Sequence, residues 1–316
     1  MDKKLFVTGG TGRLGIRFVH EALDKGYKVT ALVRDIAKAH DVFQEMNVEL
    51  ILGDLSSVSQ DVLRDAMRGK DVVHIAAVVD FRASAEHLRA SNVEGTRKVV
   101  EAAEAEHVVR LVHMSSTGIY HHPTKLPIDE SAVPTPMAGY GLTKLEAERV
   151  LEQSNLDYVM IRAPAVYGPG FDEGFRMVVD WIKASKMPII GNGKNRVPLI
   201  HVDDVVQALV LALENRNVHR DAFIVTSGEE LTQEQAYAIV AKKLGVSVPA
   251  KHVPVALAYV LVFVDWLKGL FGSKRKLLKL YVDFLAEDRV FDITKARTQL
   301  KYEPKNPLEK GLDGLV

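Results

Sequence analysis

Short apolar runs rich in β-branched residues alternate with amphipathic segments along the first 120 residues. The runs lack the polar alternation of a half-exposed strand, which is typical of strands buried on both faces of a parallel sheet. In the segments between them, apolar residues recur every three or four positions, which predicts crossover helices. Strands are expected at 5–8, 29–33, 48–52, 72–75 and 111–113, and helices at 13–25, 58–68 and 85–106. This order predicts an α/β fold with a doubly wound parallel sheet.

A glycine-rich loop follows the first strand directly. It reads Gly9-Gly10-Thr11-Gly12-Arg13-Leu14-Gly15 and leads into the first predicted helix. Its glycines fit two spacings, one through Gly10, Gly12 and Gly15 and one through Gly9, Gly12 and Gly15. A pyrophosphate needs this loop because backbone N–H groups at a helix N-terminus must touch it, and a Cβ would hold it away. The strand, loop and helix therefore predict a Rossmann dinucleotide site.

The hydrophobic pattern changes near residue 171. Longer helical segments appear there, separated by loops such as 187–197, in which Pro188, Gly191 and Gly193 act as breakers. We therefore expect a dinucleotide-binding Rossmann domain over 1–170 and a smaller mixed α/β region over 171–316. The second region is expected to bind mainly substrate, with some segments returning to the first domain.

Charge and composition exclude several classes of protein. The 41 lysines and arginines balance 41 aspartates and glutamates, so no overall field attracts nucleic acid. Hydrophobic residues make up 47% of the chain, a share typical of folded globular proteins. The chain has no cysteine and its histidines lack the spacing of a helical zinc motif, so no metal site is expected.

No apolar stretch has the length of a membrane-spanning helix. The most apolar one, 253–264, is shorter than the ~18 residues that a span requires. The N-terminus enters a strand without the pattern of a signal peptide. Because cysteine is also absent, we expect a cytoplasmic protein.

The end of the second strand bears on the choice of nicotinamide cofactor. An acid about 20 residues past the loop usually holds the ribose 2′-hydroxyl of NAD, whereas an arginine there accommodates the 2′-phosphate of NADP. Arg34 ends this strand and Arg13 in the loop adds a second positive charge. The sequence therefore favours NADP, while Asp35, which follows directly, keeps NAD as the alternative.

Tyr140 and Lys144 lie one turn apart on a predicted helix over 139–153. Residues four apart share a helix face, so the phenol and the ammonium can meet in one site. The ammonium and an oxidised nicotinamide favour the ionised phenol, which can exchange a proton with a substrate hydroxyl or carbonyl. The strand over 111–113 leads into Met114-Ser115-Ser116-Thr117, which brings hydroxyls to the same edge of the sheet.

Together these motifs resemble the extended short-chain dehydrogenases/reductases, the NAD-dependent epimerase/dehydratase superfamily, over nearly the whole chain. Further matching segments are Gly53-Asp54-Leu55, His74-Ile75-Ala76-Ala77, Asn92-Val93-Glu94-Gly95-Thr96, Arg162-Ala163-Pro164-Ala165-Val166-Tyr167-Gly168-Pro169 and His201-Val202-Asp203-Asp204-Val205. The resemblance implies hydride transfer between the nicotinamide C4 and a carbon that bears oxygen. Ser116 would polarise that oxygen, Tyr140 would move the proton, and Lys144 would lower the Tyr140 pKa and hold the nicotinamide ribose.

The resemblance also implies a set of cofactor contacts. They are Gly9, Thr11, Gly12, Arg13, Leu14, Gly15, Arg34, Asp54, Leu55, Ala76, Ala77, Asn92, Tyr140, Lys144, Pro164 and Val166. Counting back from Tyr120 favours Ser116 over Ser115 as the catalytic hydroxyl, and Thr117 is the alternative. The family usually has Arg-Pro where this chain has Arg162-Ala163-Pro164, a one-residue offset beside the expected nicotinamide.

Two branches of the family differ in substrate. Segments 76–81 and 190–195 resemble the 3β-hydroxysteroid and sterol-4-carboxylate dehydrogenases, with dihydroflavonol reductases nearby, and this favours an apolar substrate. A sugar-nucleotide epimerase or dehydratase with tightly held NAD is the alternative. The two phosphates of a sugar nucleotide need several arginines in the pocket, and the chain offers few candidates, Arg176 and Arg196. A redox-sensing regulator without catalysis is a third hypothesis, against which the Ser116, Tyr140 and Lys144 set argues.

An apolar stripe over 255–271 is expected to pack on the sheet domain or to line the substrate pocket. The basic cluster that follows it, Lys274-Arg275-Lys276 with Lys279, makes peripheral membrane contact through 253–279 a weaker alternative. The helical segments 85–106 and 139–153 would serve a homodimer of the family's type. His121 and His122 are expected in a water-exposed loop, and Asp203 and Asp204 as helix N-caps.

Overall fold

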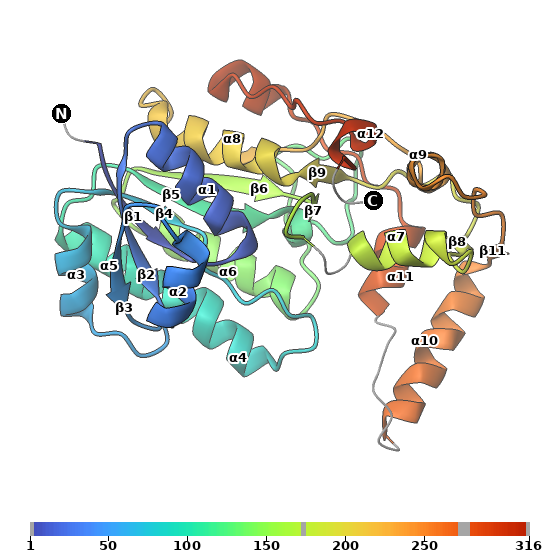
Figure 1. The fold of residues 1–316 in the computed structure, drawn as a ribbon. Coiled ribbons are helices and arrows are strands. Elements are labelled where there is room, and N and C mark those ends of the chain that lie inside the picture. Colours follow the sequence, from blue (N-terminus) through green and yellow to red (C-terminus); the bar gives the residue numbers. More distant parts are fainter. Residues whose placement is uncertain (1–2, 172–174, 271–278, 314–316) are drawn as a thin grey trace.

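A seven-stranded parallel sheet forms the centre of the protein in a computed structural model, which describes residues 3–171, 175–270 and 279–313 (Figure 1). The strand order is β10-β6-β5-β4-β1-β2-β3, and every neighbouring pair is parallel. The strands are β1 (Lys4–Thr8), β2 (Lys28–Val33), β3 (Val48–Leu52), β4 (Asp71–His74), β5 (Leu111–Ser116), β6 (Tyr158–Ala163) and β10 (Asp221–Ile224). The order reverses between β1 and β4, where doubly wound sheets bind their ligands.

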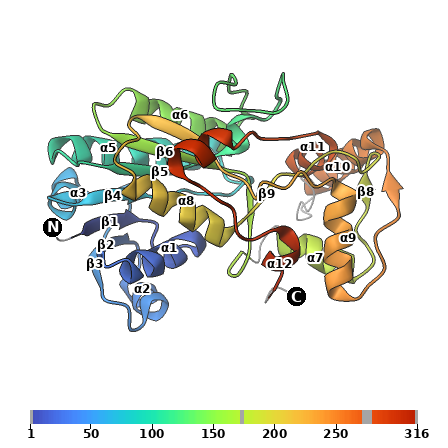
Figure 2. The ribbon, with the colours of Figure 1, turned by 90° about the horizontal axis from the view of Figure 1, so that it is seen from above.

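Helices cover both faces of this sheet, as Figure 2 shows for α1 and α8 on one side and α5 and α6 on the other. One face carries α1 (Arg13–Asp24), α2 (Ile36–Phe43) and α8 (Val202–Glu214), and the other carries α3 (Gln60–Met67), α5 (Gly95–Ala105) and α6 (Tyr140–Glu152). Each face has its own apolar core, with Phe18 and Leu209 in the first and Leu63, Val99 and Leu151 in the second. The predicted Rossmann-type α/β fold is therefore confirmed.

The helices differ from the sequence prediction in two places. The pattern did not predict α2, whose N-cap Asp35 accepts a hydrogen bond from the Lys38 N–H. The single helix expected over 85–106 is α4 (Ala85–Arg89), a π-helical turn over Ala90–Glu94, and then α5. The apolar spacing continues through the turn, so the hydrophobic pattern gave no sign of this change in winding.

The C-terminal half contributes a smaller mixed region. It contains α7 (Phe175–Lys183), β8 (Ile189–Ile190), α9 (Gln233–Leu244), β11 (His252–Val253), α10 (Val255–Leu270), α11 (Lys279–Ala286) and α12 (Leu308–Gly311). The predicted loop 187–197 includes β8, which pairs with β11. A second small pair, β7 (Ala165–Tyr167) and β9 (Leu199–His201), connects this region with the sheet domain, to which α8 and β10 return.

The predicted capping role of Asp203 and Asp204 is wrong. His201 is the N-cap residue of α8, and its Nδ1 accepts a hydrogen bond from the Asp203 N–H. The Asp203 carboxylate instead binds Arg17 on α1, and the buried Asp204 carboxylate accepts backbone hydrogen bonds from Lys305 and Asn306. Both acids lie in the first turn, so they tie distant segments to the start of α8.

Within 3–171, 175–270 and 279–313, no helix has both the length and the apolar character needed to cross a bilayer. The longest, α10, has 16 residues. The predicted basic cluster Lys274-Arg275-Lys276 lies outside the described residues.

Candidate active site

The loop between β1 and α1 is shaped by three of its glycines. A Cβ on Gly9, which has φ +76°, would lie 2.6 Å from the Ala76 nitrogen, and a Cβ on Gly15 would lie 2.1 Å from the Gly9 oxygen. A Cβ on Gly12 would lie 3.2 Å from that same oxygen, whereas Gly10 has room for an ordinary contact. The geometry therefore selects the spacing through Gly9, Gly12 and Gly15.

The N-terminus of α1 has the properties of an anion site. Gly12 is its N-cap and supplies no side-chain cap, and the first turn carries no acid. The N–H groups of its first turn and the positive end of the helix dipole suit a pyrophosphate. The side chains of Thr11 and Arg13 reach the surface there. The Leu14 side chain is buried in the core, so Leu14 can contribute to the loop only through its backbone. These residues fit a dinucleotide phosphate.

Beyond the loop, Arg34 and Asp54 lie at the ends of β2 and β3. The Arg34 side chain is 77% exposed, and its nearest acidic partner, Asp54, is 4.0 Å away. Two hydrogen bonds from Ser56 lower the pKa of Asp54 and fix its carboxylate. Leu55 packs close to Gly95. The Asp35 carboxylate caps α2, so this acid is already engaged while Arg34 remains accessible.

A buried hydrogen-bonded row crosses the sheet beneath the loop. The Thr8 hydroxyl lies 2.6 Å from His74 Nδ1, and the Thr96 hydroxyl lies 2.9 Å from His74 Nε2. Because Thr96 donates to the Asn92 carbonyl, it accepts from Nε2, and Nδ1 accepts from Thr8. Burial, together with the positive charge of Lys144, lowers the pKa of His74 to about 3. His74 is thus a neutral bridge between β1 and α5.

Asn92 connects the segment after β4 with α6. Its Oδ1 accepts a hydrogen bond from the Val78 N–H at 2.7 Å, and its Nδ2 donates to the Val78 oxygen and to the Thr143 hydroxyl. The bridge fixes the chain just past Ala76 and Ala77, which are half-buried. Both ends of the Asn92 amide are engaged with protein atoms, so its predicted contact with the cofactor stays a prediction.

The three candidate hydroxyls at the end of β5 have different surroundings. Ser115 donates to the buried Glu148 carboxylate at 2.5 Å, and Thr117 is buried in the turn that follows. The Ser116 hydroxyl accepts from the Gly118 N–H and shares a hydrogen bond with Tyr140. Of the three, Ser116 is therefore the hydroxyl that the structure brings to the phenol.

Tyr140 is the first residue of α6, after Gly139 with φ +89°. Burial raises the pKa of Tyr140 to about 12, and the hydrogen bond with Ser116 opposes that rise. The phenol is therefore protonated at neutral pH, and the ionised form that an oxidised nicotinamide is expected to favour stays a prediction. Its ring meets the ring of Phe81 edge to face, with centroids 5.6 Å apart.

Lys144 lies one turn further along α6 and is fully buried. Its Nζ donates to His113 Nε2 at 3.1 Å and to the Met114 oxygen at 2.6 Å. Burial lowers the pKa of Lys144 to about 8, and the charge of Glu148 opposes this. Tyr140 and Lys144 thus both face β5, but the ammonium binds the strand backbone and a histidine instead of pairing with the phenol.

Sequence reasoning missed His113. Burial holds its pKa well below the ordinary range, so Nε2 of its neutral ring accepts a hydrogen bond from the Lys144 ammonium. Its ring centre lies 5.1 Å from that of His74, which extends the buried row from Thr8 to Lys144. The available signal was its position: a histidine within an apolar strand, three residues before Ser116.

Behind the catalytic strand, Glu148 and Arg162 form a buried pair. Arg162 binds Glu148 through two hydrogen bonds of 2.9 and 2.7 Å and donates a third to the Tyr120 hydroxyl. Such bidentate contacts fix the orientation of both the guanidinium and the carboxylate. The pair holds the end of β6, from which Pro164 and Val166 continue toward the site, both half-buried.

The expectation of a water-exposed histidine loop is wrong for His121. It is 6% exposed, and its Nε2 lies 3.1 Å from the buried Asp283 carboxylate on α11. Only His122 reaches water. Asp283 also accepts hydrogen bonds from Tyr259 and Lys279, so the segment after Ser116 is tied to the C-terminal helices.

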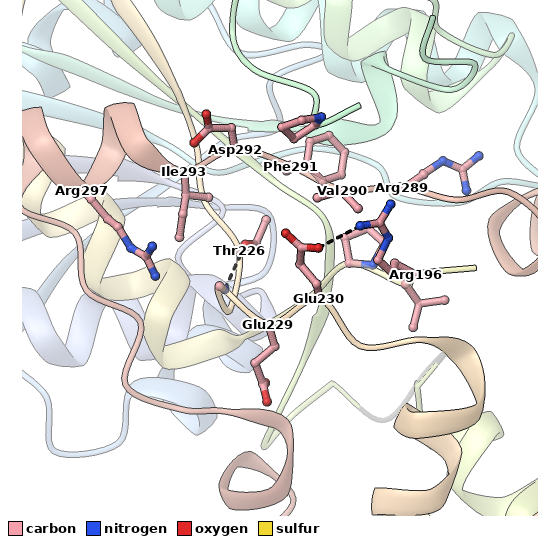
Figure 3. Close-up of a pocket in the computed structure, with 14 residues that line it drawn as sticks. Arg196, Thr226, Glu229, Glu230, Arg289, Val290, Phe291, Asp292, Ile293 and Arg297 are labelled. Carbon is pink, nitrogen blue, oxygen red and sulfur yellow. Dashed lines mark hydrogen bonds and ion pairs between the residues drawn. The ribbon is translucent and has the colours of Figure 1, made fainter. Parts of the chain in front are cut away.

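A pocket of about 240 Å³ lies between the segment after β10 and the strand-like stretch that contains Phe291 (Figure 3). Arg196, Arg289 and Arg297 line it, but no predicted catalytic or cofactor residue does. Arg196 binds Glu230 and Asp288 there, and Arg289 binds Glu287. The pocket is therefore separate from the candidate site, and two of its arginines are neutralised by acids.

No group of three potential metal ligands occurs in the described part of the chain. The candidate site instead gathers uncharged and cationic groups at the carboxyl ends of β1, β4 and β5 and at the start of α6. We call this set of strand ends the catalytic edge.

Similarity to known proteins agrees with this arrangement. The NAD dependent epimerase/dehydratase family matches residues 5–225. A 4-hydroxy-2-methyl-3-oxo-4-farnesyl-3,4-dihydroquinoline-1-oxide ketoreductase from Stigmatella aurantiaca is 28% identical over 99% of this chain and 95% of its own length. A sterol-4-alpha-carboxylate 3-dehydrogenase (decarboxylating) from Mus musculus is 28% identical over 83% of this chain and 74% of its own.

Among solved structures, UDP-glucuronic acid 4-epimerase from Bacillus cereus in complex with NAD has a TM-score of 0.77. It is 21% identical, and the match covers 98% of this chain and 96% of that one, so the likeness is one of fold. The family match covers more than half of the chain. The chain therefore belongs to the NAD dependent epimerase/dehydratase family and is an NAD(P)-dependent enzyme of the extended short-chain dehydrogenase/reductase type.

Proposed function

We propose that this protein is an NADP-dependent oxidoreductase that reduces a ketone on an apolar small molecule. The observation that carries the proposal is the placement of a protonated phenol, Tyr140, against Ser116 at the sheet edge that also holds the glycine loop. When bound, the nicotinamide supplies the hydride. The protein's own groups then have to orient the carbonyl and deliver a proton.

Ser116 and Tyr140 would share the carbonyl oxygen of the substrate. Ser116 donates a hydrogen bond that polarises the carbonyl, and Tyr140 gives its proton as negative charge develops on the oxygen. Because burial raises its pKa to about 12, Tyr140 keeps this proton at neutral pH until negative charge develops on the substrate oxygen. The Met114 oxygen fixes the Lys144 ammonium, whose charge would stabilise the resulting phenolate and which would also hold the nicotinamide ribose.

The cofactor preference rests on Arg34. Its guanidinium is exposed at the end of β2, where a planar donor can bind a 2′-phosphate through paired hydrogen bonds. Asp35, the residue that would hold the 2′-hydroxyl of NAD, is occupied as the cap of α2. This division of roles favours NADP over NAD.

The substrate class rests on the surroundings of the phenol. Phe81 stands edge to face against the Tyr140 ring and Val79 is exposed nearby, which gives the reacting face an apolar border. The two arginines that are candidates for binding a nucleotide sugar are already paired with acids: Arg196 binds Asp288 and Glu230, and Arg176 binds Asp180. The named activities of the ketoreductase and sterol dehydrogenase relatives support the same class.

A cofactor and substrate panel tests this proposal. NADPH and NADH oxidation would be followed with sterol, flavonoid and long-chain ketones, and nucleotide sugars would be assayed separately for epimerisation. The proposal expects turnover of an apolar ketone with NADPH. Bound NAD that survives gel filtration, together with epimerised nucleotide sugar and no NADPH oxidation, would replace it with the alternative function.

A further inference from the structure

Phe81 is an aromatic side chain that the apolar core does not use. It lies between β4 and α4, is 43% exposed, and belongs to none of the apolar clusters formed by the described residues. Its ring meets the Tyr140 ring at a centroid distance of 5.6 Å and an interplanar angle of 83°. The rest of the Phe81 ring is therefore open to water, directly beside the phenol.

Hydrogen bonds fix the segment that carries Phe81 relative to Tyr140 itself. The Asn92 amide accepts from the Val78 N–H at 2.7 Å and donates to the Val78 oxygen at 3.1 Å. It also donates to the Thr143 hydroxyl at 3.1 Å, which in turn donates to the Tyr140 carbonyl at 2.9 Å. Because Asn92 and Thr143 are buried, water does not compete for these bonds.

A tight turn fixes Phe81 from the other side. The Asp80 carboxylate accepts a hydrogen bond from the Arg82 N–H at 2.8 Å, and the Asp80 carbonyl accepts one from the Ala83 N–H at 3.2 Å. Ser84 follows directly as the N-cap of α4. Phe81 thus stands between two fastened points of the backbone. A side chain held in this way loses less conformational freedom when a ligand packs against it.

An open aromatic ring discriminates between flat and puckered ligands. A conjugated ring can pack offset or edge-on against Phe81, and such aromatic pairs add about 2- to 12-fold in affinity beyond the burial of apolar area. A saturated ring or an open chain gains only the burial of area. Val79, which is 61% exposed, extends the apolar surface without adding a second aromatic ring. Because Phe81 touches Tyr140, the discrimination acts on the part of the substrate that bears the carbonyl.

We propose that Phe81 is a specificity-determining residue, which selects those apolar ketones whose carbonyl belongs to a flat, conjugated ring. The inference rests on the proposed reduction of a ketone by Ser116 and Tyr140, and it adds the shape of the group around the carbonyl. The conjugated ring would pack on the open part of Phe81 while the carbonyl oxygen accepts hydrogen bonds from the two hydroxyls. A saturated or open-chain ketone would reach the same hydroxyls without the aromatic contact.

Binding of unreactive analogues tests this role without turnover. The alcohols 1-naphthol and 1-decalol share a ten-carbon skeleton, flat in the first and saturated in the second, and neither is reduced when the reduced nicotinamide is bound. Isothermal titration of the full chain gives the ratio of their affinities. In Phe81→Leu, which keeps an apolar side chain, the preference for 1-naphthol should fall about 2- to 12-fold. Phe81→Tyr keeps the aromatic ring and should retain the wild-type ratio.

Turnover gives the matching kinetic readout. The ketones 1-tetralone, 1-decalone and 2-decanone have ten carbons each, and comparing each ratio between variants cancels their intrinsic reactivities. In Phe81→Leu, kcat/KM for 1-tetralone should fall relative to the other two by the same factor as the binding ratio. If Phe81 served only to cover the Tyr140 ring, its loss would change all three ketones alike. Val109→Ala, which alters an exposed apolar residue at the amino edge of the sheet, should leave every ratio unchanged.

The role of Phe81 is overturned if Phe81→Leu keeps the wild-type ratios, if Phe81→Tyr loses them in the same way, or if the wild type does not bind 1-naphthol. Circular dichroism melting of each variant checks that the fold is retained. The two proposals fail separately. Ketone reduction with unchanged ratios in Phe81→Leu would contradict only the role of Phe81, whereas a changed binding ratio without reduction of any ketone would contradict only the proposed function.

Discussion

The catalytic edge and helix α10 place their side chains in opposite surroundings. At and just behind the catalytic edge, polar groups such as Lys144, His113 and Glu148 are buried, and each makes hydrogen bonds within the chain, although Nδ1 of His113 has no partner among the described residues. On α10, large apolar groups are exposed instead. Buried polar groups are costly unless paired, so the first arrangement fixes a geometry for chemistry. Exposed apolar groups have few contacts within the described chain, so the second arrangement contributes little to fixing a geometry.

The largest effect is expected at the catalytic edge from Tyr140→Phe, which removes only the phenolic oxygen. Loss of a general acid typically costs ~10²–10⁴ in rate, so kcat should fall at least about a hundredfold. NADPH binding, followed by fluorescence titration, should stay within a few-fold of the wild type. Tyr27→Phe, which alters a tyrosine at the opposite end of β2, serves as the control. Unchanged turnover in Tyr140→Phe would remove this residue from the mechanism.

The cofactor end of the same edge should respond to Arg34→Ala. A hydrogen bond to a charged group contributes about 1.5–3 kcal/mol, so the KM for NADPH should rise roughly 10- to 100-fold. The KM for NADH in the same variant is the internal control and should change little. If both cofactors weakened equally, Arg34 would be a structural residue and the preference for NADP would need another source.

A smaller effect, visible mainly in the pH profile, is expected from His113→Phe. The wild type should lose activity as pH rises through the Lys144 pKa of about 8, because the ammonium is the supporting form. Removing the neutral acceptor leaves the buried ammonium with one partner fewer, which lowers this pKa and moves the alkaline limb to lower pH. His219→Phe changes an exposed histidine and should leave the profile unmoved. A lower kcat with an unshifted limb would mean that His113 only fills space.

The smallest effect is expected on α10. Val260→Ser removes an exposed methyl pair, and surface substitutions of this kind usually change the free energy of unfolding by less than ~0.5 kcal/mol. Val99→Ser, on the buried side of α5, buries a hydroxyl and should cost more than about 1 kcal/mol. Urea denaturation of both variants measures the difference. A large loss in Val260→Ser would show that the α10 face supports the fold itself.

The contrast also explains which features could be predicted from sequence. Strands β1 to β5, the glycine loop and the Tyr140–Lys144 spacing depend on neighbours in the sequence, and local patterns predicted them. The partners of the site come from distant segments: Glu148 binds Ser115 from 33 positions away, and Asp283 binds His121 from 162 away. No local pattern encodes such pairs, and so His121 was expected in water and His113 was overlooked.

The state of the phenol was likewise beyond sequence reasoning. The Tyr140–Lys144 spacing predicted that the phenol and the ammonium can meet in one site. It could not predict that burial would raise the Tyr140 pKa, because burial depends on the packing of Phe81 and Ser116 around the ring. The α10 stripe was predicted as apolar, but its exposed half became visible only once α11 had been placed against the other half.

The central claim is that Tyr140 supplies the proton when a hydride passes from NADPH to an apolar ketone. Isotope transfer tests this claim most directly. The wild type and Tyr140→Phe would each be given an apolar ketone and NADPH deuterated at the nicotinamide C4, and the product would be analysed by mass spectrometry. The account predicts an alcohol with deuterium on the carbinol carbon from the wild type and almost none from the variant. Deuterated alcohol formed equally by both proteins would contradict it.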